Sequence, residues 1–70
     1  MAVNFKLIDY TVKVLVEKLM AKYQSNYDSA LELVLNSKLY ARLLTDTFLL
    51  EEGDIYLFNL LDKELSDNQM

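Results

Sequence analysis

The sequence predicts an all-α fold, a compact bundle of about four helices, and three observations lead to this prediction. Proline is absent and Gly53 is the only glycine, whereas small β-sheet proteins need such residues to turn between strands. Fifteen of the 70 residues are leucine, which favours helices, as do the alanines, lysines and glutamates. Apolar side chains also recur at helical spacing along the first third of the chain.

The length and composition predict a single helical domain over residues 1–70, with a frayed C-terminal tail at 66–70. There is no cysteine, so no disulfide stabilises this short chain. A domain of this size needs an unusually apolar core or association with another chain. The hydrophobic content of 53% is compatible with both solutions.

The first helix is expected at residues 4–23. A strand here, as the β-branched residues at 11–16 would allow, places Lys13, Leu15 and Glu17 on one face, whereas a helix separates the leucine from the charges. A helix gathers an uncharged stripe that we expect to face the core: Phe5, Ile8, Val12, Leu15, Val16, Leu19 and Tyr23.

A second apolar strip on this helix does not belong to the core stripe. We call it the α1 strip, and it consists of Leu7, Tyr10, Val14 and Ala21. Either it contacts a second molecule, or the last helix or residues 48–50 cover it within one chain. Because monomers tend to avoid exposed apolar patches, we predict a partner or homodimer surface here.

Two short helices follow, at 26–35 and 38–44. Ser25 or Asn26 is placed to cap the first, and Ser37 to cap the second. The first has a broad apolar arc and is expected to be mostly buried: Tyr27, Ala30, Leu31, Leu33, Val34 and Leu35. The second should turn inward Leu39, Tyr40, Leu43 and Leu44.

The last helix is expected at 54–65, folded back over the first. The connector before it has an apolar middle, 48–50, which should pack beneath the core. The helix itself should bury one arc of side chains: Ile55, Leu57, Phe58, Leu61 and Leu65.

Charge is divided unevenly along the chain, whose net charge is −4. Residues 1–42 carry six basic and four acidic groups, and residues 43–70 carry one basic and seven acidic groups. This difference either helps the two halves pack together or reflects a solvated acidic tail. The acidic net charge disfavours nucleic acid as a partner, since phosphate binding needs clustered lysine and arginine.

Compartment and chemistry are constrained mainly by what the sequence lacks. The longest uncharged run is Ile55–Leu61, well below the roughly 20 residues of a membrane span, and the N-terminus has no signal-peptide pattern. We therefore expect a cytoplasmic protein with no membrane partner. Histidine, cysteine and a glycine-rich phosphate loop are missing, and Glu51, Glu52 and Asp54 lack the spacing of a calcium loop. We predict no catalytic residue, no cofactor and no metal, and no enzyme activity.

The second half of the chain carries a recurring order of packing residues. Ser37, Tyr40, Leu43 and Asp46 are spaced three apart. They are followed by Tyr56, Leu57, Leu60, Leu61, Glu64 and Leu65. This order over Ser37–Leu65 resembles a group of short, all-helical, uncharacterised bacterial proteins that are sometimes encoded near toxin–antitoxin-type genes. The resemblance implies a small bacterial helical protein and transfers no catalytic residue.

These observations favour a small protein-interaction module that self-associates as a homodimer or binds another protein. A regulatory accessory protein, antitoxin-like or DNA-binding through residues 26–44, is an alternative, although Lys38 and Arg42 are the only basic residues there. A small ligand-binding protein or enzyme is a further alternative.

Overall fold

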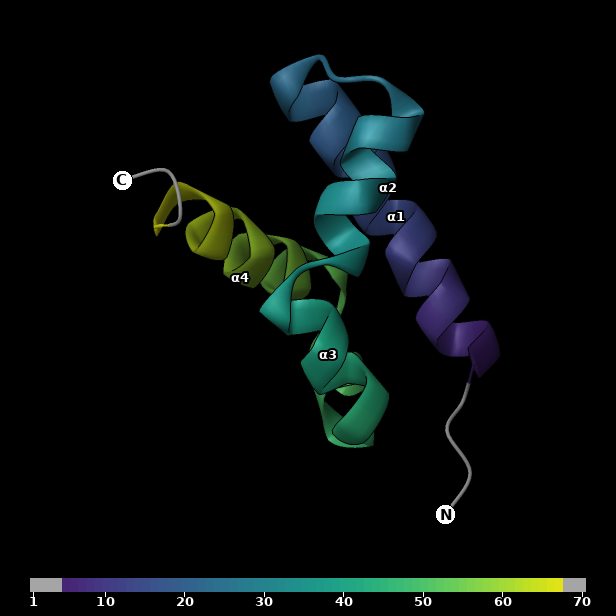
Figure 1. Cartoon of the computed structure of the whole chain (residues 1–70). Coiled ribbons are helices and arrows are strands. Elements are labelled where there is room, and N and C mark those ends of the chain that lie inside the picture. Colours follow the sequence, from purple (N-terminus) through teal and green to yellow (C-terminus); the bar gives the residue numbers. More distant parts are fainter. Residues whose placement is uncertain (1–4, 68–70) are drawn as a thin grey trace.

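The residues that the structure describes form four α-helices and one short 3-10 helix, and none of them forms a strand (Figure 1). The structure is a computed structural model, and it describes residues 5–67. The elements in chain order are α1 (Phe5–Tyr23), α2 (Tyr27–Leu35), α3 (Lys38–Thr45), η1 (Thr47–Glu52) and α4 (Asp54–Asp67). The predicted all-α architecture is confirmed.

Side-chain caps fix where the two central helices begin. The Asn26 Oδ1 atom accepts a hydrogen bond from the Ser29 backbone N–H at 2.8 Å, so Asn26 rather than Ser25 caps α2. The Ser37 Oγ atom accepts from the Tyr40 N–H at 3.1 Å and donates to the Val34 carbonyl at 2.6 Å. Ser37 therefore caps α3 as predicted, and it also ties α3 to the end of α2.

The connector between α3 and α4 is more ordered than the sequence suggested. Asp46 caps η1 by accepting a hydrogen bond from the Phe48 N–H at 3.1 Å. Leu49 and Leu50 are buried, as expected for a segment packed beneath the core, but Phe48 is 75% exposed. The prediction was wrong for Phe48 because a 3-10 turn points successive side chains in different directions.

Gly53 separates η1 from α4. Its φ of 91° and ψ of 162° lie in a region that is essentially restricted to glycine. The chain can therefore turn sharply before Asp54 begins α4. This helix continues to Asp67, two residues beyond its predicted end at residue 65. Residues 68–70, like residue 4 of the predicted first helix, lie outside the described residues.

The helices pack around α1, the longest of them. In Figure 1 α2 turns back alongside α1, and these two helices make the most extensive contact in the fold. α4 contacts α1 and α3, and η1 packs against all three. None of the helices described is both long and apolar enough to cross a lipid bilayer.

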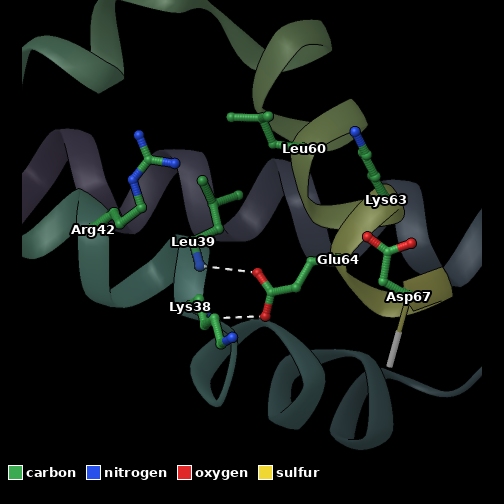
Figure 2. A pocket seen from close by; sticks show the side chains of 7 residues that line it. All are labelled: Lys38, Leu39, Arg42, Leu60, Lys63, Glu64 and Asp67. Atoms are coloured by element: carbon green, nitrogen blue, oxygen red, sulfur yellow. Dashed lines mark hydrogen bonds between the residues drawn. The ribbon is translucent and has the colours of Figure 1, made fainter. Parts of the chain in front are cut away.

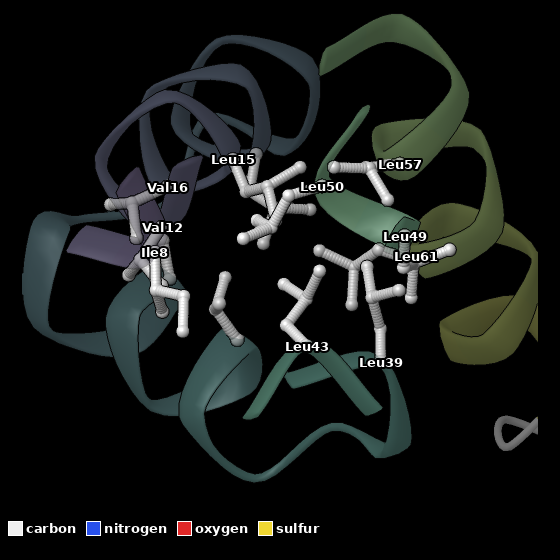
Figure 3. Packing of buried hydrophobic residues seen from close by; sticks show 13 residues of the cluster. Ile8, Val12, Leu15, Val16, Leu39, Leu43, Leu49, Leu50, Leu57 and Leu61 are labelled. Atoms are coloured by element: carbon white, nitrogen blue, oxygen red, sulfur yellow. The ribbon is translucent and has the colours of Figure 1, made fainter. Parts of the chain in front are cut away.

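One cluster of aliphatic side chains, drawn from all five elements, forms the core (Figure 3). Leu15, Leu57 and Leu61 are completely buried, which confirms the predicted inward faces of α1 and α4 at these positions. Two residues predicted to face the core are exposed: Tyr23 at the end of α1 and Ile55 at the start of α4. The full cluster is Ile8, Val12, Leu15, Val16, Leu19, Ala30, Val34, Leu39, Leu43, Leu49, Leu50, Leu57 and Leu61.

The broad apolar arc of α2 is covered on one side only. Ala30 and Val34 are buried, whereas Tyr27, Leu33 and Leu35 are exposed, so the prediction of a mostly buried helix was wrong. The reason is geometric: α1 supplies most of the contact to α2, and one helix covers only part of another helix's circumference.

Candidate interaction surface

The α1 strip lies on the surface, on the side of α1 that faces away from the core stripe. Leu7 is 40% exposed and Tyr10 is 57% exposed, while Val14 is half-buried and Ala21 is exposed. Leu7 and Tyr10 thus keep a large part of their surface exposed within the single chain. The strip therefore runs along one side of α1 as an apolar surface facing outward.

α4 borders this strip on one side. The ammonium groups of Lys18 and Lys22 each lie 6.0 Å from the centre of the Phe58 ring, a favourable cation–π distance. Lys18 follows Val14 by one helical turn. The two lysines and Phe58 thus mark the border between the α1 strip and α4.

A carboxylate on α4 holds the end of α1. The Lys22 Nζ atom lies 2.5 Å from Asp62 Oδ2, and the Tyr23 hydroxyl donates to Asp62 Oδ1. The hydrogen bond from Lys22, followed by that from Tyr23, lowers the pKa of Asp62 below its ordinary value. The same hydrogen bonds raise the pKa of Lys22 and the pKa of Tyr23. We call these three residues the Asp62 clasp.

A second carboxylate on α4 holds the start of α3 (Figure 2). The Glu64 side chain accepts from the Lys38 N–H at 2.8 Å and from the Leu39 N–H at 3.1 Å. The first turn of α3 contains no acidic residue of its own. Glu64 therefore satisfies two N–H groups of this helix end and places negative charge at the positive end of its dipole.

These contacts explain part of the uneven charge along the chain. Asp62 and Glu64 belong to the acidic half and bind groups of the first half. In contrast, Glu51, Glu52 and Asp67 of the same half are exposed. Both interpretations of the charge pattern therefore apply, each to different residues.

Two open cavities lie against α4. One, of about 330 Å³, lies between α3 and α4 and is lined by Lys38, Leu39, Arg42, Leu60, Lys63, Glu64 and Asp67. Figure 2 shows Arg42 and Lys63 on either side of Leu60 rather than converging on one point. Another, of about 500 Å³, lies between α2 and α4 and is lined by Ser29, Glu32, Leu33, Asn36, Ser37, Glu64 and Leu65. Within residues 5–67 no three potential metal ligands come together.

Sequence reasoning missed the most exposed apolar residue of α4, which lies close to the border with the α1 strip. Ile55 is 73% exposed. It precedes Phe58 by three residues and Asp62 by seven, so the three side chains share one flank of α4. Helical spacing predicted an apolar arc containing Ile55, but it gave no sign that the neighbouring helices would leave Ile55 uncovered.

Comparison with known proteins returns no relative for this chain: no protein-family model, no curated protein and no solved structure matches it. The candidate surface is therefore defined by its geometry alone.

Proposed function

We propose that this chain is a small, non-enzymatic protein-interaction module that pairs with a second copy of itself through the α1 strip. The observation that carries the proposal is the outward position of Leu7 and Tyr10 on a helix whose other side fills the core. An apolar strip of this kind on a small domain is typical of a contact surface, and two-fold pairing is the commonest form of self-association.

The size of the domain supports the same proposal. A 70-residue chain with neither disulfide nor cysteine ligand has few ways to gain stability beyond its core. Burying Leu7 and Tyr10 against another copy removes more apolar surface from water, at about 25 cal/mol for each Å². A cytoplasmic location is part of this proposal, and fractionation of source cells tests it.

Sedimentation equilibrium up to high micromolar concentration tests the proposal directly. The parent chain should show a monomer–dimer equilibrium, and Tyr10→Glu should give a folded monomer, because a charge at the interface must be desolvated on pairing. Tyr56→Glu is the matched control, since Tyr56 is also an exposed tyrosine but lies on α4. A parent chain that stays monomeric throughout this range rules the proposal out.

A regulatory accessory role through DNA is the second candidate. Its support is that three basic residues, Lys38, Arg42 and Lys63, line one cavity between α3 and α4. Glu64 and Asp67 line the same cavity and oppose the approach of phosphate. A mobility shift with duplex DNA that weakens steeply with salt would favour this candidate over self-association.

A further inference from the structure

Two residues of the α1 strip, Leu7 and Ala21, are spaced symmetrically about Val14, and the counterpart of Tyr10 is Lys18 at the edge of the strip. Leu7 and Ala21 are each seven residues from Val14, which is about 10.5 Å along the helix axis. Tyr10 and Lys18 are each four residues away, or about 6 Å. A two-fold axis through Val14, perpendicular to α1, would therefore set Leu7 of one copy opposite Ala21 of the other. This pairing matches a large side chain with a small one, as close helix packing requires.

The charges beside the strip complement each other in an antiparallel pair. Lys13 and Glu17 are exposed on the flank nearest Tyr10, and neither makes an ion pair within residues 5–67. In an antiparallel pair about Val14, Glu17 of one copy comes within about 3 Å, along the axis, of Lys13 of the other. The flexible lysine can then turn toward the opposite charge, and the contact occurs twice by symmetry.

The area of the strip shows that α4 must contribute. α1 has 19 residues and is about 28 Å long, so one face roughly 10 Å wide offers only a few hundred Å². A standard interface buries about 800 Å² on each partner. The strip alone is too small, and a second apolar contact is needed beside it.

Ile55 is placed to supply that contact. Lys18 of α1 contacts Phe58 of α4. Four residues further along both helices, Lys22 contacts Asp62. α1 and α4 therefore run in the same direction along this border. One turn earlier, Ile55 comes level with Val14, beside the position where the α1 helix of a second copy would lie.

We propose that two copies pair through antiparallel α1 helices with the two-fold axis at Val14 and with Ile55 at the edge of the interface. This inference rests on the proposed self-association and specifies how the two copies are oriented. The α1 strip of one copy binds the α1 strip of the other, which runs in the opposite direction. Even with Ile55 the interface is small, so the dimer is weak, with a dissociation constant in the micromolar range.

Disulfide cross-linking tests the register, because the chain has no cysteine of its own. Facing positions on close-packed helices bring Cα atoms within the 4.4–6.8 Å that a disulfide spans. Val14→Cys should cross-link to itself under mild oxidation. Tyr10→Cys alone should not, since its two copies lie about 12 Å apart along the axis, but mixed with Lys18→Cys it should give a mixed dimer.

Charge exchange provides a second test at exposed positions that leave the core intact. Lys13→Glu should weaken pairing by about tenfold, because both symmetric contacts change from attraction to repulsion. Adding Glu17→Lys should restore the parent affinity, while Lys63→Glu on α4 should leave it unchanged. A dimer in which Tyr10→Cys cross-links to itself as readily as Val14→Cys overturns the antiparallel register but keeps self-association. A monomeric parent chain overturns both.

Discussion

The contact between Glu64 and the start of α3 gives the sharpest stability prediction. Replacing Glu64 with alanine removes both hydrogen bonds to the Lys38 and Leu39 N–H groups and a favourable charge at the helix end. A hydrogen bond to a charged group contributes about 1.5–3 kcal/mol, and the helix dipole about 0.3–1 kcal/mol. Since Glu64 is only half-buried, water replaces part of the loss, and we expect Glu64→Ala to cost about 2 kcal/mol.

Urea denaturation followed by far-UV circular dichroism measures this cost. With an m value of about 1 kcal/mol per molar, the unfolding midpoint should fall by about 2 M. Glu64→Gln keeps one acceptor oxygen and should cost about half as much. Asp67→Ala is the control: Asp67 lines the same cavity but is exposed, so its removal should change stability by less than about 0.5 kcal/mol. Equal midpoints for Glu64→Ala and Asp67→Ala would show that the contact does not stabilise the fold.

Three further sets of substitutions test the Asp62 clasp, the hydrophobic core and the turn at Gly53. Because the pKa of Asp62 is lowered in the fold, its contribution is present above its unfolded pKa of about 4 and is lost as pH falls through the folded value. Because the pKa of Lys22 is raised, its contribution is present below about pH 10 and is lost as pH rises through the folded value. The melting temperature of Asp62→Asn should therefore depend less on pH at both extremes. Leu15→Ala should cost about 2–5 kcal/mol, whereas denaturation of Phe48→Ala should match the parent within about 0.5 kcal/mol; similar losses in both would mean that the core is misassigned. Gly53→Ala should cost about 1–3 kcal/mol by thermal melting, although nothing within 4 Å blocks a Cβ atom there, and an unchanged melting temperature would show that the turn relaxes.

Local signals were sufficient to place the helices. The capping side chains of Asn26 and Ser37 act within three residues of their own positions, so the sequence alone identified Ser37 as a cap and limited the other cap to Ser25 or Asn26. The core stripe of α1 was also predictable, because helical spacing separates Leu15 from Lys13 and Glu17 whatever packs against them.

Contacts between distant residues could not be predicted in the same way. Asp62 and Glu64 bind groups 40 and 26 residues away, and no local pattern distinguishes them from Glu51 or Glu52. One signal for Glu64 did exist: the first turn of α3 has no acid of its own, so a carboxylate from elsewhere was favoured there. Helical spacing likewise shows that Ile55 and Leu33 lie on apolar arcs. Whether each of these side chains is buried depends on how many neighbouring helices pack against its arc, which spacing does not reveal.

Self-association and stability should be linked, because the α1 strip exists as a surface only in the folded chain. A partner that binds only the folded state stabilises it by about 2.7 kcal/mol at a concentration 100 times its dissociation constant. For a domain of this size that corresponds to roughly 10–20 °C in melting temperature. The parent chain should therefore melt at a higher temperature as its concentration rises through the micromolar range, while Tyr10→Glu should melt at one temperature throughout. A parent melting temperature independent of concentration, in a sample that sedimentation shows to be dimeric, would mean that pairing does not depend on the folded strip.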